Sequence, residues 1–165
     1  MRKNKKRNHQ KHPVPNHKYK DRLFRLVFNN KRDLLDLYNA LNNTCYENPN
    51  DLEVNTLEDA VYLSMKNDIS FLIGGTLNLY EHQSTYNPNM PLRGLIYLAR
   101  LYDGYVETKN INLYSSSLKK LPIPQYFVFY NGTKEQPDET ILQLMDAFES
   151  VSDNRQPCLQ CTAVM

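Results

Sequence analysis

Apolar and polar residues alternate with a helical period over residues 21–42. The runs DRLFRLVF and LLDLYNAL both space their apolar residues for one helix face, which predicts helical structure across residues 21–42. Asn29 and Asn30 adjoin between these runs, and because both are poor helix formers we expect a break there. Residues 44–56 are polar, contain a proline, and are predicted to form a loop.

Strand-like patterning comes next, in three short runs at residues 57–64, 69–73 and 76–83. Gly74 and Gly75 separate the second run from the third and form a good hairpin signal. We therefore predict a three-stranded antiparallel meander over residues 57–83. Because side chains alternate along a strand, Glu81 and Gln83 should share one face of the last strand and His82 should occupy the other.

A second helix is predicted after the meander. Asn89 is the expected cap, Pro91 suits the first helical position, and the helix should end near Gly104. Its apolar stripe is predicted to comprise Leu92, Leu95, Ile96, Ala99 and Tyr102.

The last third of the chain is predicted to return to the sheet once. Residues 107–120 look like a loop, with 111–114 as an optional short strand, and residues 125–130 read as a core strand that ends at Asn131 and Gly132. Residues 138–148 are predicted to form a further helix. The order of helix, three strands, helix, strand and helix predicts an α/β fold around a mixed sheet.

Charge divides the chain into regions. Residues 1–20 hold eight of the twenty Lys and Arg residues and no acid, which leaves 12 basic and 18 acidic residues, a formal charge of −6, for the remainder. This segment has too few apolar residues to order itself, so we expect a disordered basic arm at 1–20. A single folded domain is expected at 21–150, and residues 151–165 are expected to be the start of a truncated C-terminal region.

No export signal and no apolar run of spanning length occur in the sequence, so a soluble, cytoplasmic protein with no membrane partner is expected. The three cysteines are then expected to be free thiols. Cys158 and Cys161 have the spacing of half a zinc site, but a lone pair of this kind is weak support for zinc.

Candidate chemistry centres on Asp68, Glu81 and Gln83. Asp68 begins the second predicted strand and Glu81 lies near the end of the third, and antiparallel pairing places such positions side by side. Two carboxylates at close range repel each other unless a cation neutralises them, which favours a hard divalent ion such as Mg²⁺. The alternative is that these polar residues simply face solvent at strand ends.

Several stretches of this chain resemble one nuclease family. They are NDISF at 67–71, LYEHQST at 79–85, NPNMPLR at 87–93, IY at 96–97 and FYNG at 129–132, together with DRLF at 21–24 and LPIP at 121–124. They resemble the Rpn branch of the PD-(D/E)XK nuclease superfamily, described as recombination-promoting nucleases or transposases. The likeness runs from about Asp21 to Gly132.

The resemblance implies a restriction-endonuclease-like core and a Mg²⁺-dependent endodeoxyribonuclease acting on double-stranded DNA. It makes Asp68 and Glu81 the metal ligands, places Gln83 where the family usually has lysine, and suggests Glu58 as an accessory acid. Glutamine can orient water but supplies no positive charge, so the metal would carry more of the catalysis.

Three basic residues outside the arm are candidate DNA contacts. Arg93 lies near a predicted helix N-terminus and is expected either to clamp a phosphate or to form a surface salt bridge. Lys119 and Lys120 are expected either to contact the DNA backbone or to be solvated. A catalytically inactive DNA-binding or interaction protein on a nuclease-like scaffold, as a mobile-element relic, is the alternative function, and a homo-oligomer is compatible with either.

Overall fold

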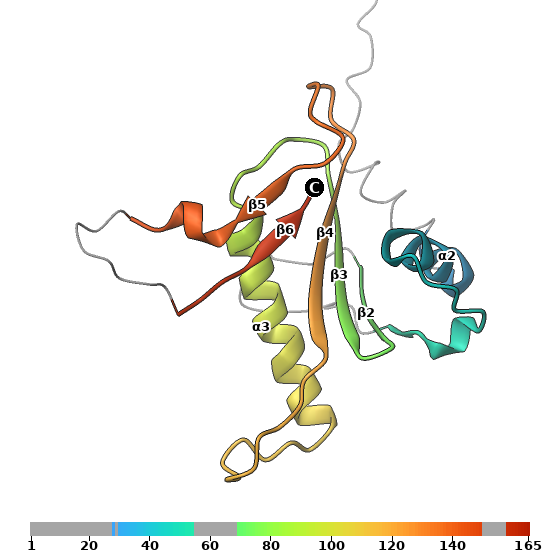
Figure 1. The fold of residues 1–165 in the computed structure, drawn as a ribbon, viewed down its shortest axis with the longest axis vertical. Coiled ribbons are helices and arrows are strands. Elements are labelled where there is room, and N and C mark those ends of the chain that lie inside the picture. Colours follow the sequence, from blue (N-terminus) through green and yellow to red (C-terminus); the bar gives the residue numbers. More distant parts are fainter. Residues whose placement is uncertain (1–27, 29, 55–68, 150–157) are drawn as a thin grey trace, which may run out of the picture.

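The structure is a computed structural model, and it describes residues 28, 30–54, 69–149 and 158–165. These residues form a six-stranded mixed sheet with one helix on each face (Figure 1). The elements are, in order, α2 (Lys31–Asn42), the 3₁₀ helix η1 (Pro49–Asp51), β1 (Glu53–Val54), β2 (Ile69–Ile73), β3 (Thr76–Gln83), α3 (Met90–Thr108), β4 (Ile123–Tyr130), β5 (Ile141–Gln143), the 3₁₀ helix η2 (Leu144–Ala147) and β6 (Thr162–Val164).

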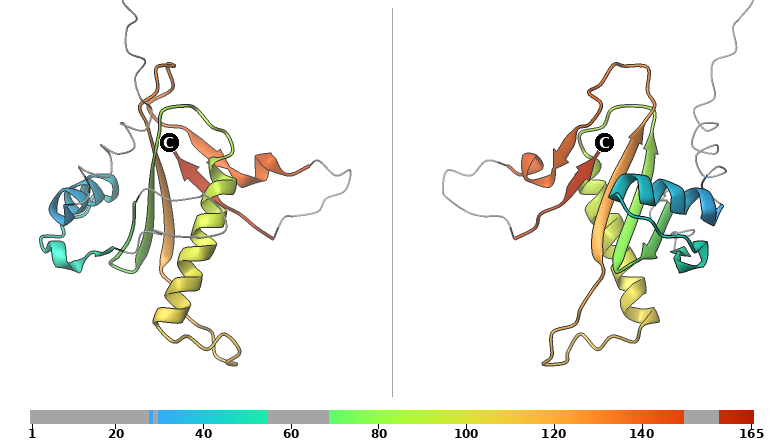
Figure 2. Two further views of the ribbon diagram at one scale, coloured as in Figure 1. Left: turned by 180° about the vertical axis from the view of Figure 1, so that it is seen from behind. Right: turned by 45° about the vertical axis from the view of Figure 1, so that its right-hand side comes forward.

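The strand order in the sheet is β1-β2-β3-β4-β6-β5. Strands β1, β2 and β3 are antiparallel neighbours, β4 lies parallel to both β3 and β6, and β5 runs antiparallel to β6. Helix α3 connects the parallel strands β3 and β4 and crosses one face of the sheet, whereas α2 lies on the other face (Figure 2). The prediction of an α/β fold with a mixed sheet is confirmed.

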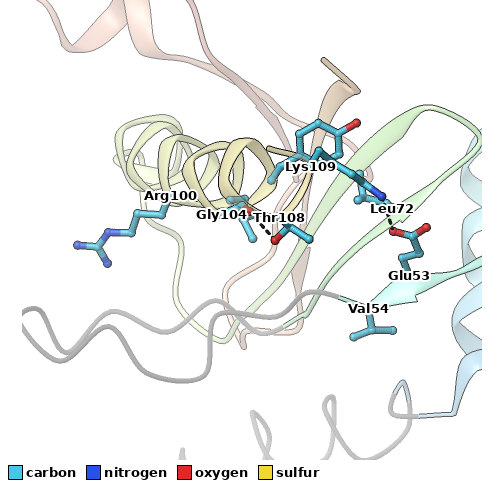
Figure 3. A pocket seen from close by; sticks show the side chains of 9 residues that line it. Glu53, Val54, Leu72, Arg100, Gly104, Thr108 and Lys109 are labelled. Carbon is cyan, nitrogen blue, oxygen red and sulfur yellow. Dashed lines mark hydrogen bonds and ion pairs between the residues drawn. The ribbon is translucent and has the colours of Figure 1, made fainter. Parts of the chain in front are cut away.

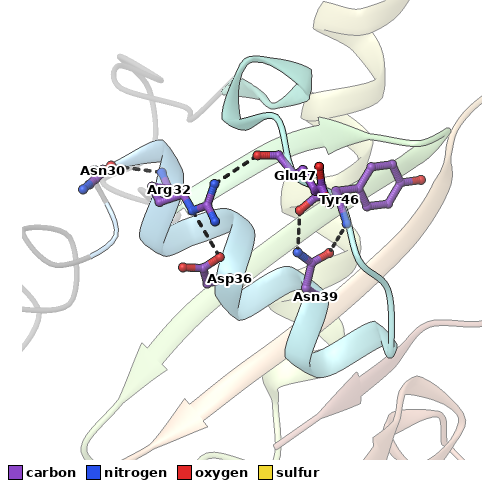
Figure 4. A network of polar contacts seen from close by, with 6 residues as sticks. All are labelled: Asn30, Arg32, Asp36, Asn39, Tyr46 and Glu47. Atoms are coloured by element: carbon purple, nitrogen blue, oxygen red, sulfur yellow. Dashed lines mark hydrogen bonds and ion pairs between the residues drawn. The ribbon is translucent and has the colours of Figure 1, made fainter.

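Both ends of α2 agree with the sequence. Asn30 caps the helix through its side chain, which accepts a hydrogen bond from the backbone of Arg32, and Asn43 adopts the left-handed conformation that ends it. The expected break at Asn30 is therefore confirmed, and residues 21–27 and 29 lie outside the described part of the chain. Asn39 anchors the following loop by two hydrogen bonds to the backbone of Tyr46, of 2.9 and 3.0 Å (Figure 4).

Arg32 connects the same helix to the loop in a second place. Its guanidinium donates a 3.0 Å hydrogen bond to the carbonyl of Glu47 and approaches Asp36 to 3.5 Å (Figure 4). The loop prediction for 44–56 fails at its end, where Glu53 and Val54 form β1 and pair with Leu72 and Phe71. This pairing is long-range, so the polar local sequence gives no sign of it. The predicted strand at 57–64 lies outside the described residues.

The hairpin at Gly74 and Gly75 is confirmed. Ile73 pairs with Thr76 across a two-residue turn, and both glycines have positive φ, of 55° and 82°. A turn of this kind matches the right-handed twist of the flanking strands and favours glycine at both positions.

Helix α3 differs from its prediction in length and in orientation. It continues past Gly104 to Thr108, whose hydroxyl donates a 2.8 Å hydrogen bond to the carbonyl of Gly104. The predicted apolar stripe is wrong, because Leu92 and Ala99 are exposed. The face that packs on the sheet consists of Met90, Pro91, Gly94, Tyr97, Leu98 and Leu101.

Gly94 explains this rotation of the helix. A Cβ at this position would overlap the ring of Tyr126 on β4, so the absence of a side chain allows the tyrosine to pack against the helix backbone. A pattern based on apolar side chains gives glycine no weight and therefore selects the wrong face.

The C-terminal part of the described chain corrects two predictions. Residues 111–114 form no strand, and the helix predicted at 138–148 is replaced by β5 and η2. Thr140 and Met165 exchange backbone hydrogen bonds of 2.6 and 2.9 Å, and the amide of Leu144 donates to the carbonyl of Cys161. Because the last residues of the chain form β6, strand pairing overrides the local helical pattern, and these residues belong to the same sheet as β3 and β4.

Apolar side chains cover both faces of the sheet. On the α3 side, Leu77 and Leu79 of β3 pack with Tyr97, Leu101 and Tyr126. On the α2 side, the core comprises Leu34, Leu35, Tyr38, Leu52, Ile69, Phe71, Ile73 and Tyr80. Strand β3 is therefore buried on both faces, and any charged residue in it must find its partners inside the protein.

Candidate functional site

Glu81 is the charged residue that β3 buries, with 1% of its surface exposed. It follows Leu79 on the α3 face of the strand, where the strand passes beneath the first turn of α3. An isolated carboxylate in such a place would cost several kcal/mol, of the order of the effective penalty per buried ion, unless it were paired and hydrogen-bonded.

Two neighbouring elements supply those partners. Arg93 of α3 approaches Oε2 of Glu81 with Nη2 at 3.2 Å, and the hydroxyl of Tyr126 on β4 donates a hydrogen bond of 3.2 Å to the same oxygen. Arg93 also donates to the hydroxyl of Tyr97 at 3.3 Å and lies 5.8 Å from the centre of that ring. The Glu81 site, by which we mean Glu81, Arg93, Tyr97 and Tyr126, therefore joins β3, α3 and β4.

The electrostatics of the site keep Arg93 charged and Tyr126 neutral. Burial acts to lower the pKa of Arg93, but the charge of Glu81 and the contact with Tyr97 outweigh it, so the pKa is raised and the guanidinium stays charged. Burial, and then the nearby Glu81 carboxylate, raise the pKa of Tyr126 well above its ordinary value. Tyr126 is accordingly a neutral donor at physiological pH.

Gln83 and His82 lie where the alternation predicts. Gln83 is the half-buried last residue of β3, and the two-residue period puts it on the same face as Glu81. His82 is buried and follows Tyr80 on the α2 face. The predicted separation of these two side chains to opposite faces is confirmed.

Asp68 and Glu58 lie outside the described residues. The described ladder ends close to them, because Ile69, the residue after Asp68, pairs with Tyr80, the residue before Glu81. Whether Asp68 joins the site stays a prediction.

Lys119 and Lys120 are exposed and lie in the loop between α3 and β4, at the bottom of Figure 1. This loop enters β4 where Ile123 pairs with Thr76 at the start of β3. Glu81 is five residues further along, about 17 Å away at roughly 3.3 Å per residue. The structure therefore brings Arg93 to Glu81 and leaves the two lysines at the other end of the strand.

Sequence reasoning missed Tyr126 and Tyr97 as partners of the site. Both tyrosines are buried, and the sequence places neither among the candidate site residues. Their polar role depends on the rotation of α3 at Gly94 and on the parallel register that pairs Leu79 with Tyr126. No local signal in the sequence indicates either feature.

A pocket of about 320 Å³ lies elsewhere, between the C-terminal half of α3 and strands β1 and β2 (Figure 3). Leu72 and Leu101 contribute apolar lining, and Lys109 approaches Glu53 to 3.8 Å at its rim. Arg93 is in the first turn of the helix, so this pocket is separate from the Glu81 site.

Of the two predicted metal ligands, only Glu81 lies among the described residues. Among them no group of three His, Cys, Asp or Glu side chains is placed to hold a metal ion, and all three cysteines are free. The carboxylate of Glu81 is a suitable oxygen ligand for Mg²⁺, but it needs at least a second acid. The fit therefore depends on Asp68.

Comparison with family models, with curated proteins and with solved structures finds no match for this chain. None of the helices in the described ranges is long and apolar enough to cross a membrane.

Proposed function

We propose that the protein is a metal-dependent endonuclease that hydrolyses phosphodiester bonds in double-stranded DNA, of the recombination-promoting nuclease or transposase type. The order of elements supports this proposal. An antiparallel hairpin, β2 and β3, is followed by the crossover helix α3 and by β4 parallel to β3. This is the arrangement expected of a PD-(D/E)XK core.

The position of Glu81 is the observation that carries the proposal. It is a buried acid on a central strand, one residue beyond the pair formed by Ile69 and Tyr80. If the ladder continues by one pair, Asp68 and Glu81 stand opposite each other, and the two carboxylates then favour a hard cation between them.

Each residue of the site has a role in this proposal. Asp68 and Glu81 hold Mg²⁺, which when bound polarises the phosphate and lowers the pKa of a water. The Gln83 amide orients the attacking water through its donor and acceptor atoms. Arg93 neutralises Glu81 in the metal-free protein, and its fork of donors is also suited to a phosphate oxygen.

The contacts of Glu81 also favour a second candidate function, a non-catalytic DNA-binding or interaction protein on the same scaffold. Oε2 of Glu81 is already bound by Arg93 and Tyr126, as in a purely structural ion pair. Under this alternative the basic arm binds DNA, the negative charge of the remaining chain limits contact elsewhere, and no phosphodiester bond is cleaved.

Plasmid nicking by the full chain tests the first candidate. Wild-type protein should nick supercoiled DNA when Mg²⁺ is added, whereas Asp68→Asn and Glu81→Gln should show only background nicking, because each removes one ligand charge while keeping the side-chain shape. Glu107→Gln is the matched control, since it makes the same change at an exposed position of α3 and should leave nicking unchanged. Circular dichroism confirms that each variant is folded.

The outcomes separate the two candidates. DNA binding without nicking in any divalent metal would support the second function and refute the first. Nicking that persists in Asp68→Asn and Glu81→Gln would show that the activity does not use this site.

Deletion of residues 1–20 tests the role of the arm. The arm should contribute phosphate contacts only, so its loss should weaken binding to all duplex sequences alike. Each lost contact should reduce the slope of log affinity against log salt by about 0.9. Fluorescence anisotropy with two unrelated duplexes measures this slope, and an unchanged slope would refute the electrostatic role.

A further inference from the structure

The loop between α3 and β4 exposes both apolar and basic side chains. We call residues 111–123 the basic loop. It contains Lys119 and Lys120 and no acid, and Tyr114 and Leu118 are 99% and 85% exposed. Its other exposed large apolar side chains are Leu113, Leu121 and Ile123. An apolar group of this size on a protruding loop is typical of an interaction surface.

A second exposed region has the opposite charge. We call residues 135–149, which include β5 and η2, the acidic edge. It contains no Lys or Arg, and its acids, all exposed, are Glu135, Asp138, Glu139, Asp146 and Glu149. Its exposed large apolar side chains are Ile141, Met145 and Phe148.

The acidic edge also contains an open strand. Strand β5 is the last strand on its side of the sheet among the described residues. The backbone of Thr140 and Leu144 forms hydrogen bonds with the residues that flank β6. Because backbone groups alternate in direction along a strand, the N–H and C=O groups of Ile141 and Gln143 point away from β6. An exposed strand edge with apolar side chains readily accepts another segment of chain.

The two surfaces are complementary but far apart in one molecule. The basic loop projects beyond the C-terminal end of α3 and the start of β4. Strand β5 and η2 lie at the side of the sheet, nearer the N-terminal end of α3, in each view (Figures 1 and 2). We propose that the basic loop of one copy docks on the acidic edge of a second copy of this chain. Such a contact is head-to-tail, so it can extend beyond a dimer.

The composition of the loop favours a protein partner over DNA. Five exposed apolar side chains accompany only two lysines, and apolar contact area contributes little to binding of a phosphate backbone. The acidic edge offers both matching features, namely negative charge beside exposed apolar side chains. This inference is independent of the proposed nuclease activity.

Charge reversal in both surfaces tests the proposal by sedimentation velocity on the full chain. Wild-type protein should associate as its concentration rises, and more weakly when salt increases from about 0.05 M to about 0.5 M. The loop variant Lys119→Glu/Lys120→Glu and the edge variant Asp138→Lys/Glu139→Lys should each weaken self-association by about tenfold. All four residues are exposed, so both variants should fold.

Mixing the two variants supplies the decisive control. In the mixture the unaltered loop of the edge variant meets the unaltered edge of the loop variant, and the two reversed surfaces also have opposite charge, so association should return in the mixture alone. A monomer at every concentration, or association that both reversals leave unchanged, would overturn the proposal. Loss of duplex DNA binding in the loop variant, without a change in self-association, would assign the loop to DNA and overturn it as well.

Discussion

Replacing Arg93 with Met should destabilise the protein by leaving a carboxylate buried without its counter-ion. Glu81 is 1% exposed and its ion pair with Arg93 spans 3.2 Å. Breaking a fully buried pair typically costs about 3–5 kcal/mol. The Arg93 side chain is 29% exposed, and Tyr126 still donates to Glu81 in the variant, so we expect the lower end, about 3 kcal/mol. Urea unfolding followed by circular dichroism measures this change in the free energy of unfolding.

The double variant Arg93→Met/Glu81→Gln is the matched control. It removes both charges while keeping the side chains similar in length, so it should be more stable than Arg93→Met alone. A loss below about 1 kcal/mol, with no coupling between the two substitutions, would show that the pair is effectively solvated and would refute the reasoning.

Three further substitutions test the packing around this site. Gly94→Ala should cost about 1–3 kcal/mol in urea unfolding, because its methyl group would overlap the ring of Tyr126; no loss would show that the helix can move aside. Gly104→Ala is in the same helix, but no atom lies within 4 Å of the added Cβ, so it should instead raise the free energy of unfolding by about 0.5–1 kcal/mol. A lower free energy of unfolding would show that the added methyl group meets other atoms. Tyr126→Phe should cost about 1–3 kcal/mol at neutral pH by removing a hydrogen bond to buried Glu81. Burial, followed by the charge of Glu81, raises the folded-state pKa of Tyr126. The contribution of Tyr126 to the free energy of unfolding is therefore present below the pKa of tyrosine in the unfolded chain, about 10, and is lost as pH rises above that value. Tyr126→Phe should therefore lose less stability than wild type above that pH, and an identical alkaline loss in the two proteins would contradict this assignment.

The sequence predicts those parts of the fold that local chemistry determines. The break at Asn30 and the hairpin at Gly74 and Gly75 each depend on the conformational preferences of a few adjacent residues, and each is confirmed. Strand β4 is predicted for a similar reason, since its apolar run is bounded by turn residues. Such features need no knowledge of distant neighbours.

Long-range pairing explains the elements that the sequence does not predict. Strand β1 exists because Glu53 and Val54 find partners in β2, and β5 exists because the last residues of the chain lie beside it. Neither segment has enough local strand signal to be recognised. The same limit applies to the orientation of α3, which Gly94 sets through contact with a strand 32 residues further along the chain.

In the candidate site, too, local sequence predicts some residues and long-range contacts determine the others. Glu81, Gln83 and His82 are assigned to their faces by a two-residue period, and the structure confirms that assignment. Arg93 was expected either to clamp a phosphate or to form a surface salt bridge, and in the structure it pairs instead with the buried carboxylate of Glu81. Tyr126 could not be predicted, because its role follows from the register of β3 against β4 and from the turn of α3 that covers them.

The free-energy cost of burying the ion pair between Glu81 and Arg93 helps to choose between the two candidate functions. Burying a carboxylate and a guanidinium removes both from water, and apolar residues of similar volume in such places are often as stable or more stable. Packing alone therefore gives little reason to bury a charge near the end of β3, on the face that carries Leu77 and Leu79 and lies against α3. A role in binding would give such a reason: under the nuclease proposal, Glu81 would exchange Arg93 for the metal ion while Tyr126 keeps the carboxylate in place. On this argument the nuclease proposal accounts for a costly feature that the structural alternative leaves without a purpose.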